Sequence, residues 1–572
     1  MYYDFEVEIP SAKGKIITRP KGNATYVLYQ YGQEYKSDKR YSIPQRTIIG
    51  KVSEQDPKMM IPNERFQLYF PDAALPEERS DADRSCCLRI GSWVIIRYVL
   101  NEYHLPELLF KRLGKDAYLF QDLVAFSIIE QDNAGQYYPD YAFCHPLFSA
   151  QMKIYSDVSV SRLLSSISHD QIIGFQDDWN AGRDKKQRIY VSYDSTNKNC
   201  QAGDIDFVEF GKPKDDKGIP VFNVSLAFDK TNRVPLFYEE YPGSITDVSQ
   251  FRCMIDKVIE YGYKKVGFIL DRGYFSKENI QYMDANQYSF IIMAKGCKSL
   301  VASMVDSVQY KFETNRECSI RAYRVYGTTI TSRLYEDDTK DRFFHIYFNP
   351  FKQAVERENL EQKIEHYRQY LEKSIGTEDK GFGKTYTDYF SLFYKGKKLV
   401  GIHEKSDVIQ NQLNHCGYFC IITSEKMTAE EALVCYKGRD VSEKLFRADK
   451  SFIGGHSMRV QSSEALSSKI FIEFVALIVR NRIYNLLKDT MQKLDGNPNY
   501  MTVPAAVREL EKIEMVRRNG KNYILDHAVT RKQKTILSAF GMDDDDIRKS
   551  AGEISGILVG AQSQTDDKRK EA

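Results

Sequence analysis

The sequence lacks the cysteine patterns of a disulfide-stabilised or zinc-binding domain. Its ten cysteines include no Cys-x2-Cys pair. The closest sets are Cys86 beside Cys87, and Cys416 with Cys420, and neither has the second pair that a structural zinc site needs. We therefore expect reduced thiols in a cytoplasmic protein.

Long apolar runs and an excess of one charge are also missing. The stretch Met1 to Lys15 has acidic residues where a signal peptide has basic ones, and no apolar run follows it. The most apolar stretch, Ile470 to Val479, contains Glu473 and falls short of the roughly 20 residues of a membrane span, so we expect a buried helix and no membrane partner. The 81 basic and 79 acidic residues nearly cancel, so any nucleic-acid-binding surface must be local.

What the sequence has is enough apolar content for several domains. A chain of 572 residues is too long for one core, and 42% of its residues are hydrophobic. The β-prone runs Tyr26–Tyr29 and Thr47–Ile49 predict a small β-rich unit at the N-terminus. Helical leucine spacing after residue 90 predicts a helical connector.

Residues 187–295 are expected to alternate between strands and helices in an informative order. The expected elements are strands at 189–191, 221–228 and 234–241, a helix from Thr246-Asp247 to about 261, a strand at 266–270, a helix at 276–286 and a strand at 289–293. The first three strands suit an antiparallel meander. Because helical crossovers return a chain to the same direction, the last two strands should run parallel to the first. This is the order of a ribonuclease-H-like core.

A strand-rich insertion is expected to interrupt this core. Strands at 323–326 and 343–348 and a charged helix at 352–373 break the pattern, and a strand at 419–422 resumes it. Thr428 can cap the following helix, with Glu431 completing a capping box. The expected regions are a small β-rich, candidate DNA-binding unit (1–75), a helical region (76–180), the first part of the α/β ribonuclease-H-like core (181–295), the insertion (296–415), the second part of the core (416–490) and a C-terminal region with a disordered tail (491–572).

Two aspartates are expected at the ends of strands that could be sheet neighbours. Asp194 follows the strand 189–191, and Asp271 follows the strand 266–270. Carboxylates brought this close repel one another unless a cation lies between them, and oxygen-rich sites suit Mg²⁺ or, in its place, Mn²⁺. The pair therefore predicts a metal site.

A third acidic residue is expected on the helix that begins at Thr428. The polar residues Tyr436, Arg439, Glu443 and Lys450 would fall within an arc of roughly 60° on one continuous helix, at about 100° per residue. Val434, Val441 and Leu445 would gather on the opposite side, toward the core. Such a polar strip can ligate metal through Glu443 and hold phosphate through Arg439 and Lys450.

These motifs resemble the DDE transposases of bacterial insertion sequences, cut-and-paste enzymes with a ribonuclease-H-like catalytic domain. The matching motifs are Tyr193-Asp194-Ser195-Thr196, Leu270-Asp271-Arg272-Gly273-Tyr274, and Tyr436-x2-Arg439-x3-Glu443-x6-Lys450. The last is the most specific, because it is a four-residue signature at the family's own spacing. Further similarity lies in 242–247 and 46–51, with Ser244 where relatives more often have Asn. The resemblance extends to about residue 485.

The resemblance implies a metal-dependent, two-metal phosphoryl transfer on DNA. Asp194, Asp271 and Glu443 would be the catalytic and metal-binding residues, with two Mg²⁺ ions about 4 Å apart. Tyr436, Arg439 and Lys450 would bind DNA phosphates near the transposon end. The implied partners are double-stranded DNA, as inverted-repeat ends and as target, and a second copy of the chain when ends are paired. The implied setting is the bacterial cytoplasm, at the nucleoid.

Other interpretations stay open for the same residues. Either aspartate alone could cap a strand or turn, and Arg439 with Glu443 could form an ordinary i,i+4 pair on a solvated face. The chain could also be a catalytically inactive, transposase-derived DNA-binding protein, or a ribonuclease-H-like nuclease without strand transfer. His345 lies in an apolar run and is expected to be packed rather than catalytic.

Overall fold

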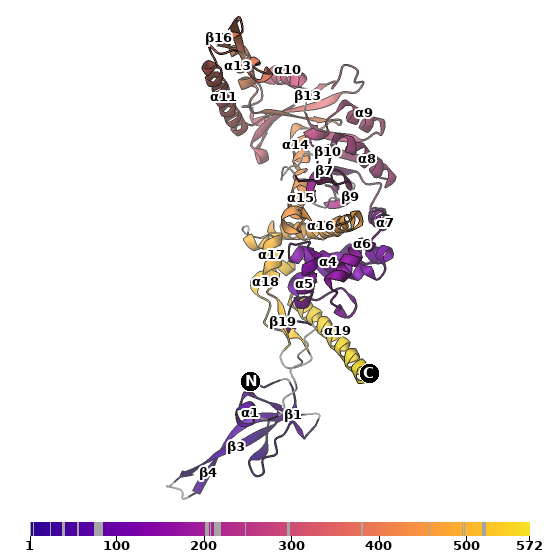
Figure 1. The fold of residues 1–572 in the computed structure, drawn as a ribbon, viewed down its shortest axis with the longest axis vertical. Helices are drawn as coiled ribbons and strands as arrows, with labels where there is room; N and C mark the ends of the chain where they lie inside the picture. Colours follow the sequence, from indigo (N-terminus) through magenta and orange to yellow (C-terminus); the bar gives the residue numbers. More distant parts are fainter. Residues whose placement is uncertain are drawn as a thin grey trace. The chain divides into compact units, whose positions relative to one another are not determined.

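In the computed structural model the chain folds into two compact units (Figure 1). Unit 1 comprises residues 1–172, 451–455 and 464–572, and unit 2 comprises residues 173–450 and 456–463. The structure describes all residues except 1, 4, 23, 37–40, 54–55, 72, 74–83, 201–204, 206, 211–218, 246, 295–297, 379–380, 456, 495, 497, 518–521 and 572. Thr246, expected to cap a helix, therefore lies outside the described residues.

Unit 1 begins with antiparallel strands. Among its described residues a five-stranded sheet has the order β1-β5-β4-β3-β2. Val27 and Ile49 of adjacent strands are buried against Phe66 of the helix that follows the sheet. The elements are β1 (Val7–Glu8), β2 (Ile16–Lys21), β3 (Ala24–Lys36), β4 (Tyr41–Val52), β5 (Met59–Pro62) and α1 (Glu64–Tyr69).

The rest of unit 1 is mainly helical. The apolar stretch 470–479 lies within a long buried helix, as expected, and Phe471 of that helix packs against Phe120. The helices are α2 (Gly91–Glu102), α3 (Leu105–Leu113), α4 (Asp116–Ile129), α5 (Tyr138–Cys144), α6 (Asp157–Ser166), α16 (Ser463–Met491), α17 (Val503–Leu510), α18 (Arg531–Ser538) and α19 (Asp544–Glu571), and the strands β6 (Cys87–Arg89), β19 (Glu514–Val516) and β20 (Ile524–Leu525) pair with one another. The side chains of the expected disordered tail lie outside the described residues, so that expectation stays a prediction. No described helix is both long enough and apolar enough to span a bilayer.

Unit 2 is built on a large mixed sheet. Within the described residues the sheet has ten strands, in the order β12-β13-β14-β17-β11-β10-β7-β8-β9, with β18 paired to β7. The strands and helices are α7 (His169–Ala181), β7 (Ile189–Cys200), β8 (Val221–Asp229), β9 (Val234–Pro242), α8 (Asp247–Glu260), β10 (Val266–Leu270), α9 (Lys277–Ala285), β11 (Ser289–Met293), α10 (Lys298–Val308), β12 (Ser319–Ile320), β13 (Val325–Ser332), β14 (Arg342–Phe348), α11 (Pro350–Lys373), α12 (Lys384–Thr387), β15 (Phe390–Lys395), β16 (Lys398–Glu404), α13 (Ser406–Asn414), β17 (Tyr418–Thr423), α14 (Ala429–Lys437), α15 (Asp440–Phe452) and β18 (Ser457–Met458).

The pairing directions agree with the expected core order. Strand β7 pairs with β8, and β8 with β9, antiparallel, whereas β10 runs parallel to both β7 and β11. Helices cover both faces of the sheet. Successive strand residues point to opposite faces, so neighbouring residues of one strand contact different helices. On β10, Phe268 contacts Phe251 of α8, while Ile269 joins a buried cluster with Leu433 of α14. Unit 2 therefore has the predicted α/β class, in the form of a mixed sheet with helices on both faces.

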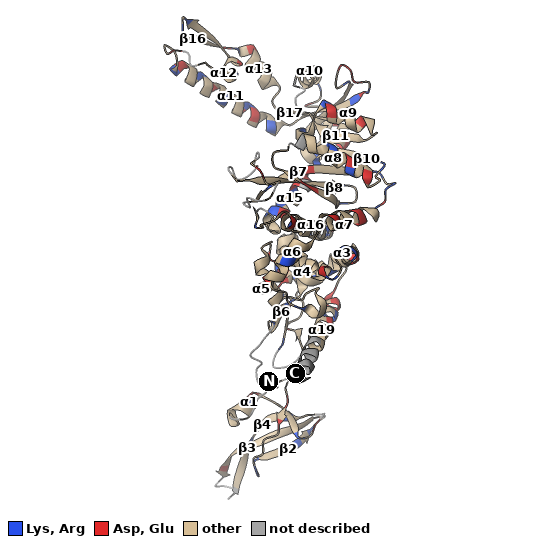
Figure 2. Ribbon diagram, turned by 45° about the vertical axis from the view of Figure 1, so that its right-hand side comes forward, with Lys and Arg blue, Asp and Glu red and all other residues tan. Residues whose placement is uncertain are grey.

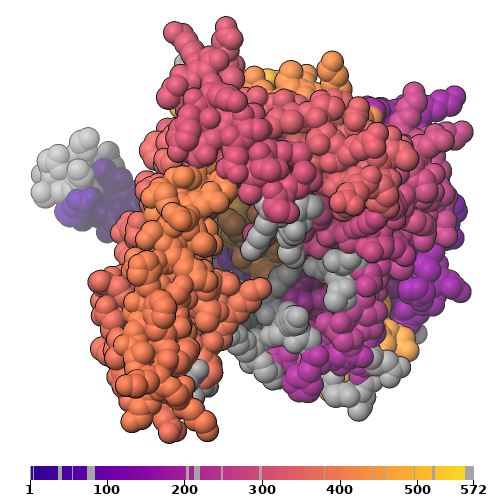
Figure 3. Space-filling view, turned by 90° about the horizontal axis from the view of Figure 1, so that it is seen from above, coloured from indigo at the N-terminus to yellow at the C-terminus, as the bar shows by residue number. Residues whose placement is uncertain are grey.

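The expected insertion is only partly separate from this sheet. Strands β13 and β14 are hydrogen-bonded into it, with β14 antiparallel to β17, so they extend the core sheet. Helix α11, the hairpin β15–β16 and helix α13 instead share their own small buried cluster around Leu371 and Phe390. Helix α11 carries both acidic and basic residues (Figure 2). The segment from α11 to α13, salmon to orange, forms a lobe in Figure 3.

His345 is packed, as the sequence predicts. It is fully buried on β14, where its ring nitrogens are hydrogen-bonded to the hydroxyls of Thr329 and Thr423. Burial lowers its pKa to about 4, so the ring is neutral near pH 7. Its place between two hydroxyls inside the sheet leaves it no role at a solvent-accessible site.

Candidate active site

Strand pairing brings the two predicted aspartates to neighbouring positions. The parallel register of β7 and β10 ends with Tyr193 opposite Leu270, and the next residues are Asp194 and Asp271. Asp271 directly follows β10, as expected. Asp194 does not follow its strand: β7 runs from Ile189 to Cys200, so Asp194 lies inside it, opposite Leu226 of β8.

An aromatic cluster holds the backbone next to both aspartates. Tyr193 and Tyr274 are buried in contact with each other, with ring centroids 5.3 Å apart, and both contact Phe251 of α8. Tyr274 belongs to the short helix η3 (Arg272–Tyr274), whose first amide donates to the carboxylate of Asp271 at 2.8 Å. The aromatic residues of the two aspartate motifs therefore pack beside both aspartates, and Tyr193 does so from the sheet face opposite Asp194.

The predicted single helix after Thr428 is two helices. Thr428 and Glu431 form the expected capping box, but α14 ends at Lys437 and α15 begins at Asp440. The residues expected on the buried side therefore do not share one face. Leu445 is buried, whereas Val434 is exposed. The angular argument from one ideal helix is wrong at this break.

A lysine from the β8–β9 turn fills the space at the break. Lys230 donates to the carbonyl oxygens of Cys435 at 3.1 Å and Val434 at 3.3 Å, at the C-terminal end of α14. A Cβ atom on Gly438 would lie 2.1 Å from Cε of Lys230, so only glycine leaves room for this side chain. Both carbonyl oxygens also accept from the amide of Gly438, so Lys230 adds a charged donor at the turn between α14 and α15.

The lysine contact predicts a non-additive pair of substitutions. Gly438→Ala should displace the flexible Lys230 side chain, and Lys230→Met should remove the same hydrogen bonds, so each is expected to lower the free energy of unfolding by about 1 kcal/mol. Urea unfolding of both single variants and the double variant measures this. The double variant should lose little more than either single one, and strictly additive losses would contradict the assignment.

Arg439, in the turn directly before α15, contacts all three predicted acidic residues. Its guanidinium donates from Nη2 to Oε1 of Glu443 at 2.5 Å and lies 3.5 Å from Oδ2 of Asp194, through Nη1, and 3.9 Å from Oδ1 of Asp271, through Nη2. The i,i+4 pair with Glu443 is thus present, but it is part of a larger cluster. The structure brings the three carboxylates together around one cation.

Exposure differs among the members of this cluster. The Arg439 side chain is 11% exposed and that of Asp194 15%, whereas Asp271 and Glu443 are 38% and 49% exposed. Burial opposes the charge on Arg439, but the surrounding carboxylates outweigh it and raise the pKa of the guanidinium above its ordinary value. Its Nε is buried without a hydrogen-bond partner. The site is therefore open on the side of Asp271 and Glu443.

The donor set fits a divalent cation. Three carboxylates share one guanidinium, which leaves two negative charges for further cations, and carboxylate oxygens are ligands that Mg²⁺ and Mn²⁺ accept. Among the described residues, no three His, Cys, Asp or Glu side chains are close enough to hold an ion without moving. The half-exposed Glu443 would have to turn from Arg439 toward the aspartates.

The remaining predicted residues differ in their surroundings. Tyr436 is buried in the cluster that includes Ile269, and burial raises its pKa to about 12 although the nearby Arg439 lowers it. The guanidinium of Arg439 lies 5.9 Å from the Tyr436 ring. Lys450 is half-buried near the end of α15. The structure thus places Tyr436 beneath Arg439, as packing support for it.

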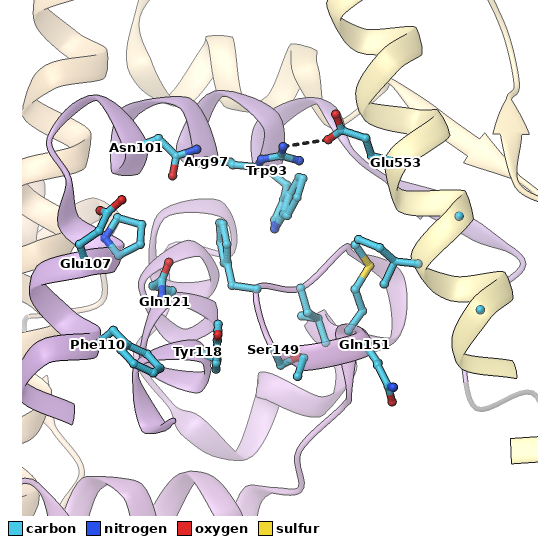
Figure 4. A pocket seen from close by; sticks show the side chains of 18 of the residues that line it. Trp93, Arg97, Asn101, Glu107, Phe110, Tyr118, Gln121, Ser149, Gln151 and Glu553 are labelled. Atoms are coloured by element: carbon cyan, nitrogen blue, oxygen red, sulfur yellow. Dashed lines mark hydrogen bonds and ion pairs between the residues drawn. The ribbon is translucent and has the colours of Figure 1, made fainter. Parts of the chain in front are cut away.

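A large cavity lies elsewhere, in unit 1. It has a volume of about 1220 Å³, and residues of α2, α3, α4 and α19 contribute to its wall. Figure 4 shows Trp93, Phe110 and Tyr118 around it, with Arg97 paired to Glu553 at 2.8 Å. None of the predicted site residues lines it. We therefore place the candidate chemistry beside β7 and β10 in unit 2.

Acidic residues gathered on adjacent central strands of a mixed sheet between helices are consistent with the ribonuclease-H-like core of a DDE recombinase. Residues 191–479, just over half of the chain, match the family described as Transposase DDE domain, and the chain belongs to this family. The matched segment contains all six predicted site residues.

Comparisons with solved structures and with curated proteins add little to this family assignment. The chain is similar to a solved structure titled "Cryo-EM structure of piggyBac transposase synaptic complex with hairpin DNA", with 9% identity, coverage of 73% of this chain and 70% of that chain, and a TM-score of 0.32. At that TM-score the likeness carries no argument about the site. No sequence relative is found among curated proteins.

Proposed function

We propose that this chain is an active DNA transposase of the cut-and-paste kind found in bacterial insertion sequences. It would bind the terminal inverted repeats of its element, cleave the DNA and join the ends to target DNA. The observation that carries the proposal is the convergence of Asp194, Asp271 and Glu443 on Arg439 inside the segment that matches the transposase family.

Each acidic residue has a distinct part in the proposed reaction. Asp194 is held inside β7 and Asp271 is fixed at the end of β10, so these two form the rigid side of the site. Glu443, half-exposed on α15, forms the adjustable side. These carboxylates would hold divalent metal ions, which would supply positive charge beside the phosphoryl oxygens and would lower the pKa of an attacking water or 3′-hydroxyl.

The basic residues of the same segment are proposed to hold DNA phosphates. Arg439 presents a planar guanidinium suited to two phosphate oxygens, and Tyr436 supports it from below. Lys450 adds a second positive charge near the far end of α15. Positioning a phosphate in this way favours in-line attack without a covalent enzyme intermediate. Two DNA ends would require two copies of the chain.

A strand-transfer assay tests the proposal. The full-length protein is incubated with labelled linear DNA that carries the inverted repeats flanking its gene, together with a supercoiled target plasmid, in Mg²⁺ or in EDTA. We expect ends joined to the target in Mg²⁺ and no cleavage in EDTA. Cleavage without joining would identify a nuclease instead, and repeat binding without cleavage would identify an inactive DNA-binding protein.

A further inference from the structure

A buried ion pair joins the strand and the helix that carry two of the acidic residues. Lys198 of β7 and Asp449 of α15 have side chains only 2% exposed, and Nζ lies 2.6 Å from Oδ2. The other carboxylate oxygen of Asp449, Oδ1, is buried without a hydrogen-bond partner. Neither residue belongs to the motifs that the sequence singles out.

This pair and the contact between Arg439 and Asp194 connect the same two elements at two points. Asp194 and Lys198 are four residues apart on β7, so they share a face of the sheet and are separated by about 13 Å. Arg439 directly precedes α15 and lies ten residues before Asp449, a separation of about 15 Å at the rise of a helix. The two spacings match, so both contacts form only when α15 lies in one register along β7.

The two contacts also have opposite polarity. At one end the strand supplies the acid and the helix segment supplies the base, with Arg439 facing Asp194; at the other end Lys198 of the strand faces Asp449 of the helix. Sliding α15 by one turn would bring neither pair together. Reversing the helix direction would place acid against acid and base against base.

A buried ion pair is a poor way to gain stability. Taking both charges out of water costs several kcal/mol per ion, and apolar residues of similar size are often equally stable or better. Asp449 carries an additional cost through its unpartnered oxygen. A function in positioning accounts for such a pair better than a function in stability does.

We propose that Lys198 and Asp449 are positioning residues that set the register of α15 along β7 and thereby hold Glu443 within reach of Asp194 and Asp271. The inference rests on the proposed metal-dependent function. The pair lies six residues beyond Glu443 on the helix and four beyond Asp194 on the strand, so it acts through the backbone of both elements. Because both side chains are buried, the pair would act without contacting DNA or metal.

The test replaces the pair by apolar residues and measures metal binding. The full-length double variant Lys198→Met with Asp449→Leu keeps the volume and removes both charges, and the pairing of β18 with Asn199 and Cys200 still ties this end of the sheet together. We expect a melting temperature within a few degrees of wild type. We also expect Mn²⁺ affinity, by isothermal titration calorimetry, to fall at least tenfold, with a matching rise in the metal concentration for half-maximal cleavage.

A second variant guards against misfolding of the double variant, and a control variant tests whether loss of any buried ion pair has the same effect. Asp449→Asn preserves shape and should weaken Mn²⁺ binding severalfold even if the double variant does not fold. Asp338→Asn weakens a comparably buried pair, in which Arg342 lies 3.0 Å from Asp338 in the same unit, and should leave Mn²⁺ affinity unchanged. Wild-type Mn²⁺ affinity in folded Lys198 and Asp449 variants would overturn the proposal. Absence of Mn²⁺ binding by the wild type would instead overturn the proposed function on which it rests.

Discussion

Replacing Asp194 by asparagine is expected to lower Mg²⁺-dependent cleavage of terminal-repeat DNA on the order of a thousandfold or more. The substitution keeps the shape of the side chain but removes one of two fixed charges at the edge of the sheet, and a metal ion supplies several kcal/mol of transition-state stabilisation. Glu443→Gln should have a similar effect, because Glu443 is the only acidic side chain of α15 in contact with Arg439 among the described residues. Single-turnover cleavage of end-labelled DNA measures both.

Repeat binding and a matched variant separate this loss from misfolding. Both variants should bind repeat DNA with nearly wild-type affinity in gel-shift assays, because neither removes a positive charge. Asp440→Asn neutralises a carboxylate on the same helix, three residues before Glu443, and should cleave at a rate close to wild type. Full cleavage by Asp194→Asn and Glu443→Gln would remove both residues from the catalytic site.

Substitution of Arg439 should separate metal binding from catalysis. In the structure its guanidinium neutralises part of the charge of three carboxylates, so Arg439→Ala leaves them repelling one another and should lower the free energy of unfolding of metal-free protein by roughly 2 kcal/mol. The same change removes a competitor for the carboxylates. We expect Mn²⁺ affinity at least equal to wild type and a larger rise in melting temperature on adding Mn²⁺.

Catalysis should respond to the same substitution in the opposite direction. Without a guanidinium to hold phosphate, cleavage by Arg439→Ala is expected to fall about a hundredfold even at saturating Mn²⁺. Arg447→Ala removes an exposed positive charge from the same helix and should leave metal affinity unchanged. Weaker Mn²⁺ binding by Arg439→Ala than by wild type would show that the arginine supports the metal site rather than competing for it.

Much of the core could be predicted because its elements are locally encoded. The apolar runs of β8, β10 and β11 and the helices between them lie where their patterns place them, and the parallel direction follows from the crossovers. The sequence predicts a shorter strand than β7, because Asn197, Lys198 and Asn199 have low strand propensity, but the strand continues to Cys200. Pairing with β8 and the contact with Asp449 override that preference, and both partners are distant in sequence.

The errors at the site have the same origin. Gly438 is compatible with a continuous helix in sequence, whereas in the fold the break is occupied by the side chain of Lys230, some two hundred residues earlier. The sequence does not indicate that β14 of the expected insertion pairs with β17 of the core, because the two strands are about seventy residues apart. The acidic positions could be predicted from motif spacing, whereas the cation that gathers them and the buried pair that sets their register needed the fold.

Titration of the full-length protein with Mn²⁺, followed by electron paramagnetic resonance, measures whether the three carboxylates share a divalent metal site. We expect carboxylate-dependent binding that weakens at least tenfold in each of Asp194→Asn, Asp271→Asn and Glu443→Gln, and that is unchanged in Asp440→Asn. Wild-type binding curves for all three variants would contradict a divalent metal site shared by β7, β10 and α15.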